Sequence, residues 1–263
     1  MKRMILTGIL ALATGLTALV AQQPPPKKGD APAQTGPAPK SQAEAQALGA
    51  LMQQQANPDA FIKAGDEFLT KYADTDFKEA ILLTMANAYQ QKGDNDKAQI
   101  YAEKVLDLNP KSFQAQLMVG ELLAGRTREN DLDKEEKLGK AEKALNGAIA
   151  NVNAAPKPNP QLTDAQWDEG KKYVVAQAHN GLGMVALVRK KYDAAITEFK
   201  TAADTDPQPT YVVRLASAYE SAGKHAEAIA ACDKVLADPQ LHPQIKTVAT
   251  NIKNTATANS TKK

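Results

Sequence analysis

The chain has 263 residues, 43% of them apolar, which is enough for one or two packed cores. Removing Lys2 and Arg3 from its 32 basic residues leaves as many basic as acidic residues, of which there are 30. A strongly basic protein that binds nucleic acid is therefore disfavoured. Aromatic residues make up only 5% of the chain. The composition favours close-packed helices with small residues, because the bulky residues typical of strands are scarce.

Residues 1–21 have the layout of a signal peptide. Lys2 and Arg3 precede an uncharged run rich in Leu, Ala, Gly and Thr that ends at Ala21. We expect cleavage after Ala21 and export, to the periplasm of a bacterium. The alternative is that the run stays in place as a membrane anchor, although its length is near the lower limit for crossing a bilayer.

Residues 22–40 are rich in Pro, Ala and Lys and form a predicted disordered linker. Proline fixes φ and removes a backbone donor, so this stretch is expected to be extended and solvated. It acts as a spacer or, alternatively, as a proline-rich motif for a partner. The packable part begins near Ser41, with a length that suits one elongated domain or two small ones. We assign a helical repeat domain to residues 41–254 and a polar tail to residues 255–263.

Small residues return at a nearly fixed interval between residues 45 and 242. Ala64 and Ala98 are 34 residues apart, and Ala195 and Ala228 are 33 apart. Each belongs to a segment with helical spacing of apolar residues, and a second helical segment precedes it. A period of this length is typical of stacked helix pairs, in which each pair needs a neighbour to cover its apolar face.

At these residues the chain resembles the tetratricopeptide repeat family, whose unit is a pair of antiparallel helices. The best match is residues 79–112, with Met85, Ala86 and Tyr89 in the first helix and Gly93 in the turn. Further units match at residues 176–209 and 209–242, with a degenerate unit at 45–78 and an irregular one around Val119, Gly120 and Leu145.

The resemblance implies an all-α fold, a right-handed superhelix (α-solenoid) of helix hairpins. A final helix from Pro243 to Asn254 has one apolar stripe and is expected to cap the exposed end. Two insertions interrupt the repeat. About nine extra residues from Arg126 onward lengthen one turn, and a second insertion holds the loop at residues 156–160 and a lengthened helix after Thr163.

Few residues suggest catalysis or metal binding. The three histidines are scattered, and no metal, phosphate-loop or nucleophile motif occurs. We expect His179 to be a packed, hydrogen-bonded ring and Cys232 a small core residue. Trp167 is expected to pack under the adjoining loop, the alternative being an enzyme or carbohydrate-binding protein that uses it. The sequence thus predicts no enzyme, no catalytic residue, no metal and no cofactor.

The resemblance also implies that the first helices line a concave face that binds peptide segments. The family's clamp for a terminal carboxylate is matched only by Asn87 and Arg214, and Leu83 stands where a lysine is needed, so a chaperone C-terminus is not expected. The groove is expected to be uncharged and partly apolar, which favours an extended or helical segment held by side-chain amides. The mapped residues are Leu83, Asn87, Gln90, Gln114, Leu117, Glu121, Gln177, Asn180, Met184, Val213, Arg214, Ser217 and Glu220.

The sequence therefore predicts a non-enzymatic protein–protein interaction scaffold of the cell envelope that binds a protein or peptide partner. The alternative is a membrane-tethered envelope assembly factor whose leader is not cleaved. No nucleic acid partner is expected, and membrane contact is expected only through an uncleaved leader. Self-association through an exposed repeat end stays open.

Overall fold

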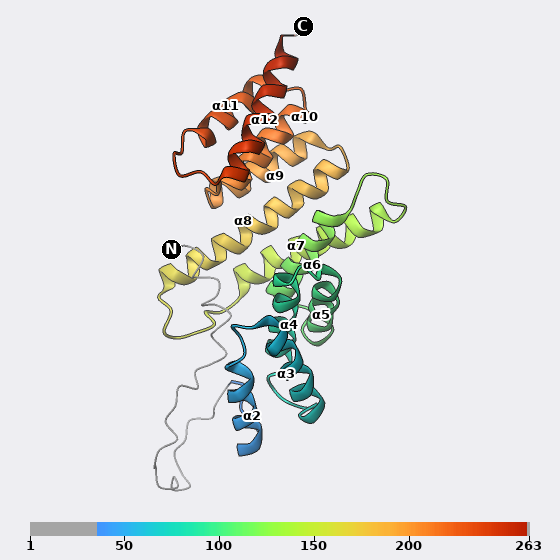
Figure 1. The fold of residues 1–263 in the computed structure, drawn as a ribbon, viewed down its shortest axis with the longest axis vertical. Coiled ribbons are helices and arrows are strands. Elements are labelled where there is room, and N and C mark those ends of the chain that lie inside the picture. Colours follow the sequence, from blue (N-terminus) through green and yellow to red (C-terminus); the bar gives the residue numbers. More distant parts are fainter. Residues whose placement is uncertain (1–35, 262–263) are drawn as a thin grey trace. The chain divides into compact units, whose positions relative to one another are not determined.

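A computed structural model describes residues 36–261, and within this range the regular structure is all helical, without a strand (Figure 1). The predicted leader, residues 1–21, and most of the predicted linker lie outside the described residues. None of the described helices is both long and apolar enough to cross a membrane. The helices are α2 (Gln42–Met52), α3 (Pro58–Lys71), α4 (Lys78–Gln91), α5 (Asn95–Leu108), α6 (Phe113–Arg126), α7 (Lys134–Ala154), α8 (Asp164–Val188), α9 (Tyr192–Thr205), α10 (Pro209–Ser221), α11 (His225–Leu236) and α12 (Pro243–Ser260).

The helices form two compact units. The first ends at Pro110 and contains α2 to α5, and the second begins at Lys111 and contains α6 to α12. In each unit, successive helices pack as hairpins, with α4 against α5, α6 against α7, α8 against α9 and α10 against α11. The predicted all-α fold of helix hairpins, an α-solenoid, is confirmed, and the predicted repeat domain of residues 41–254 is divided between the two units.

Short polar side chains define several helix starts. The Ser41 side chain accepts a hydrogen bond from the backbone N–H of Glu44, and Asn57 caps α3 directly before Pro58. Thr163 and Gln166 form a reciprocal capping box at the start of α8. These side chains bind backbone N–H groups that have no partner within the first helical turn.

One turn geometry joins the helices of three hairpins. Gly93 has φ 77° between α4 and α5, and Gly223 has φ 73° between α10 and α11. Lys190 takes the same place between α8 and α9, with φ 59°. In all three turns the N–H of the residue after the positive φ donates to a carbonyl five residues earlier, as in Lys191 to Ala186. Lys190 therefore adopts a left-handed conformation that glycine adopts without steric cost.

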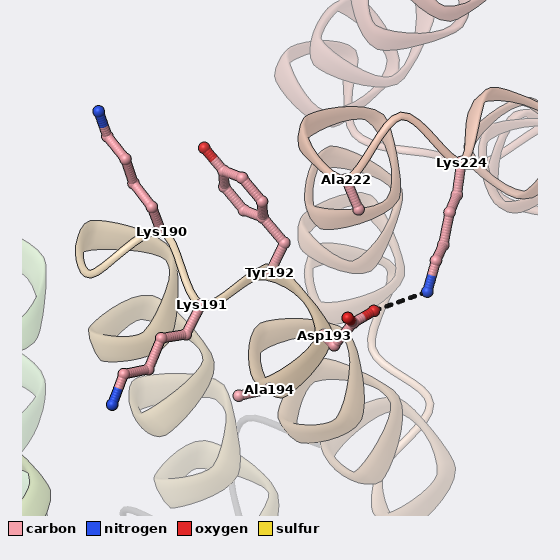
Figure 2. A pocket seen from close by; sticks show the side chains of 7 residues that line it. All are labelled: Lys190, Lys191, Tyr192, Asp193, Ala194, Ala222 and Lys224. Atoms are coloured by element: carbon pink, nitrogen blue, oxygen red, sulfur yellow. Dashed lines mark hydrogen bonds and ion pairs between the residues drawn. The ribbon is translucent and has the colours of Figure 1, made fainter.

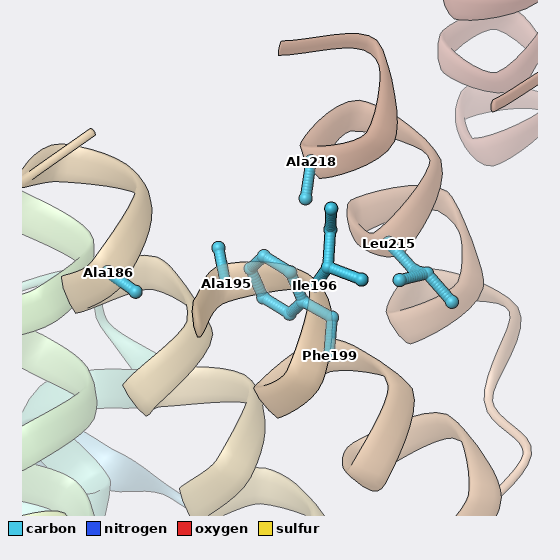
Figure 3. Packing of buried hydrophobic residues seen from close by; sticks show 6 residues of the cluster. All are labelled: Ala186, Ala195, Ile196, Phe199, Leu215 and Ala218. Atoms are coloured by element: carbon cyan, nitrogen blue, oxygen red, sulfur yellow. The ribbon is translucent and has the colours of Figure 1, made fainter. Parts of the chain in front are cut away.

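Small residues let the helices of unit 2 approach closely. Phe199 of α9 is fully buried beside Gly183 of α8, and a Cβ added to Gly183 would lie 2.6 Å from the Phe199 ring. Figure 3 shows Phe199 in a cluster contributed by α8, α9 and α10. Leu145 of α7 meets both Gly120 of α6 and Gly181 of α8 in the same way, with added Cβ atoms at 2.5 and 2.8 Å. Large side chains on the second helices thus fill notches left by glycines on the first helices.

Helix α12 covers the end of unit 2, as predicted, but it is longer than predicted. It packs on α10 and α11 through a cluster formed by Val213, Val235, Leu241 and Ala249. The sequence predicts that this helix ends at Asn254, whereas α12 continues to Ser260, into the segment assigned as a polar tail at residues 255–263. Ala256 lies two helical turns after Ala249 and is also fully buried, so the same packed face continues.

The close contact between Gly183 and Phe199 predicts how a substitution at Gly183 changes the stability of the fold. Gly183→Ala is expected to lower the free energy of unfolding by about 1–3 kcal/mol, because the new methyl group overlaps the buried Phe199 ring. The matched control is Gly139→Ala in α7, where nothing lies within 4 Å of the added Cβ. That control should raise stability by about 0.5–1 kcal/mol through the ordinary helix preference for alanine. Urea unfolding followed by circular dichroism measures both, and equal effects of the two variants would contradict the close packing.

Candidate partner-binding face of unit 2

The mapped residues lie on first helices of both units. In unit 1 they are on α4, where Leu83 is buried, Asn87 half-buried and Gln90 exposed. The Asn87 side-chain amide donates to the backbone carbonyl of Leu83 at 2.9 Å. Its hydrogen-bonding capacity is therefore partly used inside its own helix.

In unit 2 the mapped residues lie on α6, α8 and α10, and some belong to the core. Leu117 and Val213 are 8% and 6% exposed, so they offer a partner little surface. Gln114 and Ser217 are half-buried. Glu220 is already used inside the unit, because it accepts a hydrogen bond at 2.7 Å from the Asn259 amide of α12.

Asn180 breaks the pattern of the other repeats. It stands three residues before the small residue Gly183, and the equivalent positions before Ala86, Gly120 and Ala216 are held by Leu83, Leu117 and Val213. All four side chains are buried to a similar degree, with Asn180 7% exposed. The fold thus takes an apolar side chain here in three repeats and a polar one in the fourth.

Two acceptor atoms on α8 lack hydrogen-bond partners. The side-chain oxygen Oδ1 of Asn180 and Oε1 of Gln177 are buried and unpaired among the described residues. The Gln177 amide nitrogen donates to the Tyr173 hydroxyl at 3.3 Å. Asn180 and Gln177 are three residues apart on one helix, so they lie on the same face. A buried acceptor without a donor costs about 1–3 kcal/mol, which makes this pair unfavourable for the isolated chain.

Glu121 of α6 and Arg214 of α10 bring charge to the same region. Burial raises the pKa of Glu121 from its ordinary value to about 7, although the attraction of Arg214 opposes that rise. Burial likewise lowers the pKa of Arg214, and the attraction of Glu121 and Tyr211 partly offsets this lowering. Neither side chain forms an ion pair with a described residue. Glu121 and Arg214 thus add two half-buried ionisable side chains to the set of residues that was expected to form an uncharged groove.

Met184 joins the three helices at this face. The Arg214 guanidinium contacts the Met184 sulfur, and a Cβ added to Gly125 of α6 would lie 3.5 Å from the Met184 methyl group. We call the set Glu121, Gln177, Asn180, Met184 and Arg214 the inner polar face of unit 2. Its chemistry is mixed, with several acceptors, one guanidinium and one thioether.

Two tyrosines at this face were missed by the sequence analysis. Tyr173 is the partner of the Gln177 amide, and Tyr211 is buried within electrostatic reach of Glu121 and Tyr173. The sequence could have indicated them, because spacings of three or four residues place two side chains on one helix face. Tyr173 precedes Gln177 by four residues, and Tyr211 precedes Arg214 by three.

A separate pocket of about 380 Å³ lies at the α8–α9 turn (Figure 2). Lys224 is paired with Asp193 at 2.7 Å, and Lys190 with Glu129 of the α6–α7 loop at 2.5 Å. Figure 2 shows Lys190 and Lys191 extending away from the Asp193–Lys224 pair. None of the residues lining it carries a buried unpaired polar atom in the described part of the chain, so it makes a weaker candidate than the inner polar face.

The other singled-out side chains have structural roles. His179 pairs with Glu198 at 2.7 Å across the α8–α9 hairpin, as expected for a packed ring. Trp167 is 6% exposed and packs against Phe113, with ring centroids 6.3 Å apart. Cys232 is fully buried, and burial raises the pKa of its thiol. Within residues 36–261, no three His, Cys, Asp or Glu side chains gather closely enough to hold a metal ion.

Comparisons with known proteins agree with this architecture. A family model described as "Tetratricopeptide repeat" matches residues 161–210 and 181–243, and a second model with the same description matches residues 79–112. No curated protein matches the chain.

Two solved structures show the same fold at low sequence identity. A thermophilic TPR protein from Thermus thermophilus is 19% identical, covering 80% of this chain and 98% of its own, with a TM-score of 0.54. MamA from Desulfovibrio magneticus RS-1 is 18% identical, covering 74% of this chain and 94% of its own, with a TM-score of 0.56.

The raised pKa of Glu121 predicts a pH-dependent stability. The folded chain holds the Glu121 proton more tightly than the unfolded chain, so this contribution is complete below about pH 4.5 and is lost as the pH rises toward 7. Between about pH 5 and pH 8, the wild type should lose of the order of 1–2 kcal/mol relative to Glu121→Gln, which does not titrate. Urea unfolding of both proteins across this range measures the difference, and parallel curves would show that Glu121 is not desolvated.

Proposed function

Because the chain belongs to the tetratricopeptide repeat family, we propose that it is a non-enzymatic protein–protein interaction scaffold of the cell envelope. The partner segment binds the inner polar face of unit 2. The observation that carries this proposal is Asn180, a buried amide whose carbonyl oxygen is unpaired among the described residues, at a position where three other repeats have Leu or Val. A buried polar group that weakens the fold and has no partner among the described residues is expected at a binding site.

The arrangement of the face supports an intermolecular role. Glu121, Asn180 and Arg214 come from three different first helices, so a segment lying across them contacts all three. Met184 adds a flexible apolar contact between them, of a kind that adapts to different partners. The residues that could support other chemistry, Trp167 and Cys232, are used in packing, which favours binding over catalysis.

Export is the second part of the proposal and rests on residues 1–21. Lys2 and Arg3, the uncharged run and the small residues before Gln22 support a cleaved signal peptide and a periplasmic location. The alternative is a membrane-tethered envelope assembly factor, in which the uncleaved leader is the anchor and residues 22–40 are the stalk.

Cleavage is measured on the exported protein. N-terminal sequencing of the full chain expressed with its own leader should give a mature protein beginning at Gln22, because the leader ends in Ala21. A protein that retains Met1 and sediments with membranes would instead establish the tethered alternative.

The binding face is tested by Asn180→Leu. This change removes the unpaired oxygen and restores the apolar side chain found in the other repeats, so stability should be unchanged or rise by about 1 kcal/mol. Partner capture from envelope extract should fall at least about fivefold, because a hydrogen bond lost from a desolvated site costs about 1–3 kcal/mol.

The matched control is Asn146→Leu on the exposed surface of α7, where the Asn146 amide only donates to the carbonyl of Glu142 in its own helix. Capture by this variant should equal that of the wild type. Quantitative pull-down and thermal melting of both variants separate binding from folding. Unchanged capture by a folded Asn180→Leu protein would remove the inner polar face as the binding surface.

A further inference from the structure

We propose that the inner polar face of unit 2 recognises a lysine or arginine side chain of the partner, which docks against Glu121, Gln177 and Asn180. This inference rests on the proposed function and adds the chemical class of the group that is bound.

The buried side-chain atoms without a hydrogen-bond partner at this face are both acceptors. Asn180 is more than nine-tenths buried, and its Oδ1 has no donor among the described residues. Gln177 presents a second such oxygen from the same face of α8. The group that completes them must therefore be a donor. Ammonium and guanidinium groups carry several N–H donors and no acceptor, which matches this set.

The Glu121 carboxylate favours a cationic ligand group over a neutral hydrogen-bond donor. Its carboxyl group is half-buried and forms no hydrogen bond or ion pair with a described residue. A backbone amide would satisfy Asn180 or Gln177 but would give the Glu121 carboxylate no charge-assisted hydrogen bond. A charge-assisted hydrogen bond is roughly twice as strong as a neutral one, so a cationic side chain gains most at this carboxylate.

Arg214 of this chain does not serve as the hydrogen-bonding partner of Glu121. Arg214 of α10 lies within electrostatic reach of Glu121, yet its guanidinium contacts the Met184 sulfur and forms no ion pair with a described residue. The oxygens of Glu121 are thus left open. An acidic partner residue at Arg214 is the competing arrangement, but it would bring a carboxylate toward Glu121 and two unpaired carbonyl oxygens, which is unfavourable.

The register of the helices supports a single site. Leu145 of α7 meets both Gly120 and Gly181, which are the immediate neighbours of Glu121 and Asn180. Glu121 and Asn180 therefore lie at a similar level of α6 and α8, two helices that pack against each other. Tyr173 and Tyr211 are the other titratable groups near this face, and burial raises the pKa of Tyr211, so its hydroxyl stays neutral near pH 7.

The test uses the full mature chain and rhodamine-labelled pools of short peptides. Each pool has one fixed central residue, Lys, Arg, Gln or Glu, between randomised uncharged residues. Fluorescence anisotropy at neutral pH should show the Lys and Arg pools binding at least about fivefold tighter than the Gln pool, and the Glu pool weakest of all.

Two isosteric variants distinguish a direct contact with Glu121 from the effect of the protein's overall charge on peptide binding. Glu121→Gln should remove the preference for the basic pools. Glu220→Gln removes the same charge from α10, but that carboxylate is already bonded to Asn259, so the preference should remain. A preference that Glu121→Gln leaves intact, or that both variants abolish equally, would overturn the assignment.

The pH dependence gives a readout that a purely structural role of Glu121 would not produce. As the pH rises from about 6 to about 8, the Glu121 carboxyl loses its proton, so the affinity for the Lys pool should rise up to about tenfold. The Glu121→Gln variant should show no such rise. Lysine itself stays charged throughout this range.

The outcomes also separate this inference from the proposed function. Equal binding of the Lys and Gln pools, tighter binding of the Glu pool, or no binding of any pool would each overturn the cationic ligand. The scaffold function is judged independently, by whether Asn180→Leu reduces capture of the natural partner.

Discussion

Close approach of helices at small residues is the constraint on which the rest of unit 2 depends. Leu145 of α7 occupies the notches at Gly120 and Gly181, and Phe199 of α9 occupies the notch at Gly183. A side chain at any of these glycines would push the helices apart, because packed interiors leave no room for an extra methyl group. The same contacts that fix the distance between helices also fix the level at which α6 lies beside α8. Glu121 and Asn180, the chain neighbours of two of these glycines, lie at a similar level of α6 and α8 as a result.

The fold was largely predictable because the constraint repeats in the sequence. Small residues such as Ala86 and Gly183 recur at a nearly constant interval, and glycines at positions 93 and 223 mark the turns with positive φ. The prediction failed where the local residues gave no signal. Lys190 adopts the same turn geometry without being glycine, held by the hydrogen bonds of the turn. The end of α12 was placed too early because Thr255 to Ser260 is polar, whereas the buried Ala256 depends on contact with the rest of the unit.

The positions of the binding face followed from the repeat register, but the properties of its residues did not. Leu117 and Val213 were mapped as groove residues and are buried. The desolvation of Glu121 and Arg214 depends on how α6, α8 and α10 converge, and no local pattern encodes it. A repeat consensus states which side chains point inward, whereas the hydrogen-bond partners of each side chain are set by residues far away in the chain.

At Asn180 the residue type that suits packing differs from the residue type that suits the proposed binding. At three equivalent positions the fold uses Leu or Val with nearly the same exposure, so the packing of α8 does not require an amide. The amide brings an unpaired oxygen into the interior, which lowers stability with no compensating contact in the described chain. Natural sequences are locally consistent with their folds except where function requires otherwise. The cost at Asn180 is small compared with the packing energy of a helix hairpin, so the scaffold tolerates it, and a bound donor would recover it. The stability of the repeat array is thereby coupled to occupancy of its inner polar face.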